Sequence, residues 1–172
     1  ATIAGDTTGA ATEDVSTAVT GTLTATDTDS SQSSMADKSS TASTYGTYSM
    51  SSGAWTYSLD STNSAVQALA AGATMTDSLS FASADGTAQT VTITITGAND
   101  AATIAGDTTG AATEDVSTAV TGTLTATDTD SSQSSMADKS STASTYGTYS
   151  MSSGAWTYSP VSYTHLTLPP IL

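Results

Sequence analysis

ITGANDAATIAGD, residues 95–107, closes one sequence unit and opens an identical one. Residues 102–159 repeat residues 1–58 without a single change. An exact repeat of this length is typical of a tandem array of small domains rather than of one large fold. The sequence therefore predicts a complete unit over residues 1–101, a truncated second unit over residues 102–159, and a tail over residues 160–172.

Charge and composition exclude several classes of function. The 172 residues include 16 Asp and Glu against 2 Lys and Arg, a formal net charge of −14. Nucleic acids and anionic membranes are recognised through basic surfaces, so neither is an expected partner, and no apolar run is long enough for membrane insertion. There is no cysteine for a disulfide or thiolate metal site. The one histidine, His165, lies in the tail, so we predict no enzyme activity and no catalytic residue in the repeat.

The alternation of apolar and polar residues predicts an all-β fold. Val91, Ile93 and Ile95 alternate with threonines, which places the apolar side chains on one face of a strand. The many threonines then suit the outer faces of sheets, which argues against a disordered Ser/Thr-rich stalk. Seven strands are predicted, near residues 1–4, 18–26, 32–37, 44–50, 54–59, 74–83 and 89–96. Hairpin turns are expected at residues 51–53 and 84–86, and a short helix within residues 64–71.

Large apolar side chains define the expected core. Trp55 is predicted at its centre, and the other members are Tyr48, Met50, Tyr57, Leu59, Met75, Leu79, Phe81 and the apolar residues of strand 89–96. Asp77 has the same parity as Leu79 and Phe81, so it should point inward. Either its strand carries a β-bulge there, or Asp77 is buried and hydrogen-bonded.

Acidic residues fall in loops that strand alternation brings to the ends of a seven-stranded sandwich. Calcium takes six to eight oxygen ligands at about 2.3–2.6 Å, from carboxylates, carbonyls and water. We predict a calcium site at the junction of the two units, with ligands from Glu13, Asp14, Asp60, Asn99 and Asp100 of one unit and Asp128 and Asp130 of the next. Asp27 and Asp29 would serve a preceding junction, and Glu114 and Asp115 a following one. The alternative is that the acids only keep the protein soluble.

Several motifs together resemble VCBS repeats. They are TEDV (12–15), GTLTATDTD (21–29), YGTY (45–48), GAWTYSLD (53–60), VQAL (66–69), and residues 79–86 and 91–100. The resemblance covers residues 1–101 and 102–159. It implies a cadherin-like or immunoglobulin-like β-sandwich repeated in tandem, within a large bacterial cell-surface or biofilm adhesin exported by type I secretion. The junction also resembles the cadherin linker Asp-x-Asn-Asp-Asn-x-Pro, but Gly97 and Ala101 replace two of its ligands and no proline follows.

The tail shares no sequence pattern with the repeats that precede it. Residues 160–172 resemble a peptide that arises by translation of sequencing-adapter DNA, and we predict that they are not native; the alternative is a genuine terminal segment. The sequence has no initiator Met or signal peptide, so we expect it to be a piece of a longer protein.

Three functions remain open at this point. The first is a calcium-stiffened extender whose partners are the neighbouring repeats, carrying an adhesive tip toward host-cell or biofilm-matrix glycan or protein. The second is an extracellular module that binds glycan itself through Tyr45, Tyr48 or Trp55. The third is a two-carboxylate hydrolase, which identical tandem copies argue against. An exposed row of aromatic rings would favour glycan binding, and burial of those rings would favour the extender.

Overall fold

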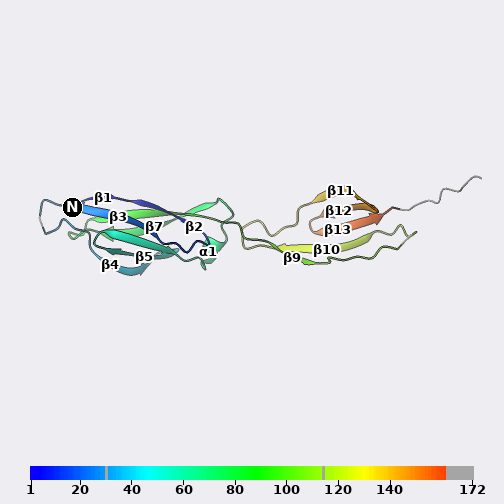
Figure 1. Ribbon diagram of the computed structural model, residues 1–172, viewed down its shortest axis with the longest axis horizontal. Coiled ribbons are helices and arrows are strands. Elements are labelled where there is room, and N and C mark those ends of the chain that lie inside the picture. The colour runs from blue at the N-terminus through cyan, green and yellow to red at the C-terminus, as the bar shows by residue number, and fades with distance from the viewer. Residues whose placement is uncertain (30, 114, 162–172) are drawn as a thin grey trace, which may run out of the picture. The chain divides into compact units, whose positions relative to one another are not determined.

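The computed structural model describes residues 1–29, 31–113 and 115–161 (Figure 1). The chain divides into two compact units, Ala1–Asp100 (unit 1) and Ala101–Leu172 (unit 2). The predicted all-β fold is confirmed, because strands dominate both units and the helix described is a single turn, α1 (Ser64–Gln67). No helix within these ranges combines the length and apolar character needed to span a bilayer.

Unit 1 consists of two sheets around one core. The five-stranded sheet has antiparallel pairings in the order β1 (Thr2–Gly5), β3 (Val19–Thr26), β6 (Ala54–Leu59), β5 (Gly46–Ser51) and β4 (Lys38–Ala42). The three-stranded sheet has the order β2 (Thr8–Thr12), β8 (Ala88–Thr96) and β7 (Thr74–Ala82). β7 and β8 form an antiparallel hairpin, and β2 joins β8 in parallel.

The alternating side chains meet between these sheets as predicted. Trp55 is 1% exposed, and Tyr57 and Val91 are fully buried. The core also contains Leu23, Met35, Tyr48, Met50, Val66, Leu79, Phe81, Ile93 and Ile95, with Leu59 and Met75 partly buried against it. Tyr48 and Phe81 join the two sheets through an edge-to-face contact, with ring centroids 5.3 Å apart.

The predicted connections are also present. Ser52 and Gly53 both have positive φ, 50° and 84°, as a two-residue hairpin turn between β5 and β6 requires. The turn between β7 and β8 contains Asp85, whose carboxylate accepts hydrogen bonds from its neighbours Ser83 and Thr87. The helix α1 is capped by Asn63, whose side chain accepts a hydrogen bond from the Ala65 amide.

Residues 32–37 form no regular strand, so the prediction of a strand there is wrong. In this segment only Met35 forms a bridge, with Ser83, and the strand lies later, at β4. The segment is held by two backbone hydrogen bonds to the end of β7, from Ala36 to Ala82 and from Ala84 to Ser34. One buried side chain, Met35, is enough to anchor it to the core without a regular ladder.

The prediction also missed β2, so unit 1 has eight strands rather than seven. TGAAT has no large alternating side chains, and glycine and alanine are depleted in strands. The strand forms because β8 supplies its ladder, with Thr8 opposite Thr92 and Thr12 opposite Thr96. A Cβ on Gly9 would lie 2.7 Å from the Ile93 Cδ1 atom, so a larger residue at this position would have to displace the Ile93 side chain.

The inward Asp77 is buried and hydrogen-bonded. β7 pairs with β8 in unbroken register from Thr74 to Ala82, which excludes the bulge. The Asp77 carboxylate is 2% exposed and accepts hydrogen bonds from the hydroxyls of Ser43 (2.6 Å) and Tyr57 (3.0 Å). It also accepts from the backbone amides of Thr44, Tyr45 and Ser78. Asp77 therefore ties the β4–β5 turn and β6 to the opposite sheet.

Unit 2 repeats the five-stranded sheet. Its strands, in sheet order, are β11 (Lys139–Ser144), β12 (Gly147–Ser152), β13 (Ala155–Pro160), β10 (Val120–Thr127) and β9 (Thr103–Gly106). Its described residues contain no counterpart of the β2-β8-β7 sheet. The tail residues 162–172, with His165, lie outside the described residues, so the prediction that the tail is not native remains a prediction.

Candidate metal site

The two ends of unit 1 are defined by the strands that meet there. At the N-terminal pole, the amino group of Ala1 contacts Asp27 and Asp85, which lies in the β7–β8 turn. At the C-terminal pole, β8 ends at Thr96, and the segment after α1 packs against Gly97. Gly97 exchanges backbone hydrogen bonds there with Gly72 and Ala73.

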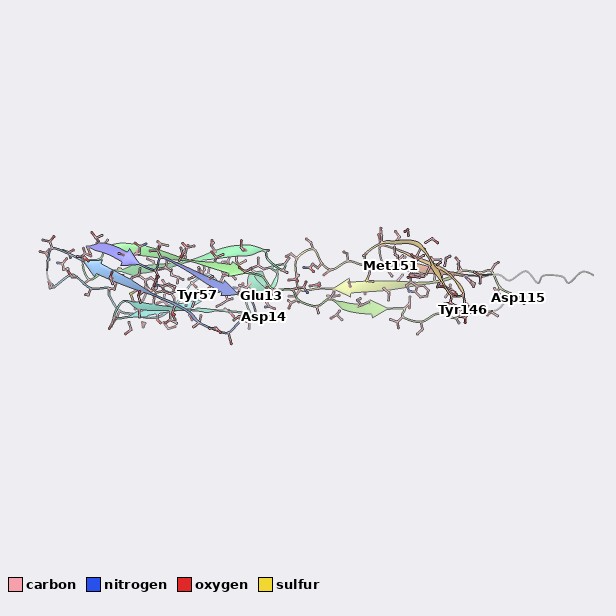
Figure 2. All side chains as sticks on the ribbon, turned by 45° about the horizontal axis from the view of Figure 1, so that its top comes forward. Glu13, Asp14, Tyr57, Asp115, Tyr146 and Met151 are labelled. Atoms are coloured by element: carbon pink, nitrogen blue, oxygen red, sulfur yellow. The ribbon has the colours of Figure 1, made fainter. Side chains whose placement is uncertain are left out.

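Glu13 lies at the C-terminal pole, as predicted. Its amide donates a hydrogen bond to the Thr96 carbonyl (2.9 Å), and its Oε2 atom accepts one from the Ala98 amide (3.0 Å). The side chain is 1% exposed. Glu13 therefore joins the β2–β3 loop to the residues through which the chain leaves the unit (Figure 2).

Asp14 lies beside Glu13 in a left-handed conformation, with φ of 59°. Its carboxylate accepts a hydrogen bond from the Gln67 side-chain amide (3.1 Å), which connects this loop to α1. Asp115, the same position in unit 2, has φ of 60°, so the conformation is a local property of the repeated loop. Glu114 lies outside the described residues.

Asp60 opens the segment that leads to α1. Its amide donates to the Tyr45 carbonyl (2.8 Å), and its Oδ1 atom accepts from the Thr62 hydroxyl (2.6 Å) and the Thr62 amide (2.9 Å). The hydrogen bond from the Thr62 hydroxyl, and to a smaller extent the bond from the Thr62 amide, hold the pKa of Asp60 below its ordinary value of 3.8. The remaining two predicted ligands of this pole, Asn99 and Asp100, follow Ala98, and the Asn99 side-chain amide donates to the Asp100 carbonyl.

The lowered pKa of Asp60 predicts how the stability of unit 1 depends on pH. Because the folded-state pKa of Asp60 is lowered, its contribution is present above pH 3.8 and is lost as the pH falls through the folded-state value. Asp60→Ala should lower the melting temperature of unit 1 at neutral pH, and by less at a pH well below 3.8. Thermal melts followed by circular dichroism at both pH values would measure this. An equal loss at both would show that Asp60 acts through packing rather than through its charge.

The N-terminal pole brings together Asp27 and Asp85. The Ala1 amino group contacts both carboxylates and lies 2.7 Å from the Asp27 Oδ2 atom. Each carboxylate accepts a hydrogen bond from this amino group, and that bond is the main cause of its lowered pKa. Asp29 follows in the same loop, and its amide donates to the Asp27 Oδ1 atom (2.9 Å). Asp85 was not among the predicted ligands; its position in a turn at the same end as Asp27 was the available signal.

The equivalent loop of unit 2 has the same local geometry. The Asp130 amide donates to the Asp128 Oδ1 atom (2.8 Å), and the Asp128 amide donates to the Ser134 hydroxyl (2.9 Å). The Asp130 side chain is buried, and its Oδ2 atom accepts from the Gln133 amide group (3.1 Å). Both copies therefore form a compact Asp-x-Asp turn.

Within each unit, the structure brings the predicted ligands to common ends but does not cluster them closely. Over residues 1–29, 31–113 and 115–161, no group of three or more Asp, Glu, His or Cys side chains lies close enough together to hold a metal ion. A scan against protein-family models and a search of curated proteins found no match to this chain.

Proposed function

We propose that this chain is a calcium-stiffened extender from a large bacterial cell-surface adhesin that contributes to adhesion and biofilm formation. The observation that carries the proposal is the position of the chain ends in the complete unit. Ala1 contacts Asp85 in the β7–β8 turn, whereas Thr96 lies at the far end of β8. A nine-residue strand spans about 30 Å, so each complete repeat advances the chain by roughly that length.

Burial of the aromatic rings favours the extender over glycan binding. Trp55 is 1% exposed and Tyr48 is 8% exposed, and Tyr45 is only partly exposed. In unit 1 these rings therefore form core rather than an exposed platform. A module that presents few specific side chains and is repeated exactly suits a spacer, with adhesion to a glycan or protein target assigned to another part of the longer protein.

Calcium fits the chemistry of the poles. Their side chains offer carboxylate and amide oxygens, which a hard cation prefers. We propose that the site takes oxygens from two successive repeats. Binding would restrict the linker that includes Asn99 and Asp100 and would make the array stiffer.

Calcium should therefore raise the melting temperature of the 172-residue chain, and a chelator should reverse the change. At 100 times its dissociation constant a bound ion adds about 2.7 kcal/mol, a shift on the order of 10 °C. Asp100→Ala and Asp128→Ala should each remove most of the shift. Asp29→Ala is the matched control, because Asp29 occupies the same Asp-x-Asp turn as Asp130 but is assigned to a different junction.

An unchanged melting temperature with and without calcium would contradict the calcium proposal and leave the extender proposal to a second measurement. Small-angle scattering of three or four complete repeats reports their stiffness directly. An extended form that becomes stiffer with calcium supports both proposals, whereas a compact, collapsed form would contradict the extender.

A further inference from the structure

β2 and β8 lie side by side and run in the same direction, from the N-terminal pole of unit 1 to its C-terminal pole. β8 begins after the β7–β8 turn and ends at Thr96. β2 is parallel to it and ends at Thr12, directly opposite Thr96. The chain reaches β2 from the N-terminal pole through β1, and it leaves β8 at the C-terminal pole (Figure 1).

This arrangement decides how tension along the chain acts on the unit. Tension draws β2 toward the N-terminal pole, because the preceding chain lies there, and it draws β8 the other way, toward the linker to unit 2. Both forces act along the strands and in opposite directions. The bonds of a parallel ladder are evenly spaced along the strands, so they share such a load and must fail together. In a hairpin pulled apart at its open end, by contrast, the bonds break one after another.

The ladder between β2 and β8 extends beyond the two strands at both ends. The Thr92 amide donates to the Thr7 carbonyl (3.0 Å), and the Glu13 amide donates to the Thr96 carbonyl (2.9 Å). The Glu13 side chain adds a further bond, because its Oε2 atom accepts from the Ala98 amide (3.0 Å). Three bonds therefore flank the five residue pairs, and Glu13, which is 1% exposed, makes two of them.

One face of this ladder is closed to water by the core. Ile93 and Ile95 of β8 are fully buried, and Ala11 of β2 is 8% exposed. A Cβ added to Gly9 would lie 2.7 Å from the Ile93 Cδ1 atom and 3.2 Å from the Trp55 Cη2 atom, so the core packs directly against β2. A bond broken on this side is not replaced at once by a bond to solvent, which makes its loss costly.

The strands on either side of the ladder differ in how firmly they are held. β8 is the middle strand of its sheet and also pairs with β7 over nine residues, whereas β2 pairs over five. β1 has a separate attachment, a four-residue ladder with β3. Loss of β1 leaves the three-stranded sheet intact, whereas loss of β2 uncovers Ile93 in the core. Under tension, the β2–β8 ladder is therefore the connection whose failure unfolds the unit.

We propose that residues 7–13 and 92–98 form a mechanical clamp, the β2–β8 clamp, which lets the complete repeat carry tension without unfolding. This use rests on the proposed extender function, because a spacer that carries an adhesive tip transmits force when the tip is held. The bonds of the clamp come from protein groups alone, so its strength does not depend on calcium. Glu13 is its positioning residue at the C-terminal pole, besides its proposed role as a calcium ligand.

Single-molecule stretching of the full 172-residue chain, in the presence of a chelator, tests the clamp. The chain has no cysteine, so paired cysteine substitutions at exposed positions fix the two points of force. Thr2→Cys with Ala101→Cys loads β2 against β8 along the strands. Ala73→Cys with Ala101→Cys pulls the β7–β8 hairpin apart at its open end. We expect the first pair to need a several-fold higher force, although the hairpin has nine residue pairs and the clamp five.

A third pair, Thr8→Cys with Ala101→Cys, leaves β1 outside the loaded segment. It should need about the same force as Thr2→Cys with Ala101→Cys. A large drop would assign the resistance to the β1–β3 ladder and would overturn the proposal, as would equal forces in the clamp and hairpin directions. These forces are measured without calcium and separately from the scattering of repeats, so a failure of the clamp is distinct from a failure of the extender proposal.

Proline substitutions locate the resistance within β2. The Thr7 carbonyl and the Glu13 amide both bond β8, so by alternation the Ala11 amide points toward β8 and the Ala10 amide points away. Ala11→Pro removes one bond of the clamp and should shorten the lifetime of unit 1 at fixed force about tenfold in the clamp direction. Ala10→Pro is the matched control and should have a much smaller effect, because an edge strand tolerates proline where its amide points outward.

The hairpin direction separates a mechanical loss from a general loss of stability. Ala11→Pro should change the lifetime little when force is applied through Ala73→Cys and Ala101→Cys. An equal shortening in both directions would show that the substitution only destabilises the fold, and this result would overturn the assignment of the clamp to β2.

Discussion

Replacing Asp77 by alanine is expected to lower the free energy of unfolding of unit 1 by about 2–4 kcal/mol. The carboxylate is buried and accepts five hydrogen bonds, four of them from the β4–β5 turn and β6 of the opposite sheet (Ser43, Thr44, Tyr45 and Tyr57). Its removal leaves buried donors without acceptors, and each such donor costs about 1–3 kcal/mol.

Unit 2 shows that some of these donors can find other hydrogen-bond acceptors. There the hydroxyls equivalent to those of Ser43 and Tyr57 turn to the carbonyls of Gly147 and Tyr146. The same change in unit 1 would recover part of the lost energy. The Tyr45 amide, which donates to the Asp77 Oδ2 atom at 3.0 Å, belongs to the backbone and cannot turn in this way. The expected cost therefore stays below the sum over all five bonds.

Hydrogen exchange at β8 amides measures this effect in unit 1 alone, because the described part of unit 2 has no β8 counterpart. Tyr57→Phe removes one of the five donors and should cost about 1 kcal/mol, whereas Tyr158→Phe removes a bond on the open face of unit 2 and should cost less. An Asp77→Ala variant as stable as the parent would show that the network contributes nothing net. Burial and then the Asp77 charge raise the pKa of Tyr57, so its hydroxyl remains a donor at neutral pH.

Much of this fold could be predicted because strong local patterns coincide with tertiary contacts. Val91, Ile93 and Ile95 alternate and are all fully buried. Trp55 occupies the core of the complete unit as its strand parity indicated. β2 could not be predicted, because TGAAT has no pattern of its own. The identical sequence at residues 109–113 forms no strand, which shows that β8 rather than local propensity decides its structure.

The candidate site was predictable in its location and not in its details. Strand alternation places Glu13 and Asn99 at the same pole, and the hydrogen bond from the Ala98 amide to Glu13 agrees with that. The partners of each carboxylate were not predictable, because they depend on loop conformation. Asp60 binds Thr62 two residues away, and Asp14 binds Gln67, which is distant in sequence. Sequence alone gives no measure of how closely such carboxylates converge.

Replacing Trp55 by alanine should lower the free energy of unfolding of unit 1 by about 3–5 kcal/mol, the cost of deleting a large aromatic ring from a closed core. Trp55 is 1% exposed, and its Nε1 atom donates to the Asp6 carbonyl at 3.0 Å. The identical residue of unit 2, Trp156, keeps this bond, to the Asp107 carbonyl at 2.8 Å, but is partly exposed. Trp156→Ala should therefore cost only about 1–2 kcal/mol.

This pair of substitutions isolates the contribution of the second sheet, because sequence, strand and indole hydrogen bond are the same in both units. Hydrogen exchange at β6 amides in Trp55→Ala and at β13 amides in Trp156→Ala measures each loss in its own unit. Equal losses would show that β7 and β8 add nothing to the stability that Trp55 provides.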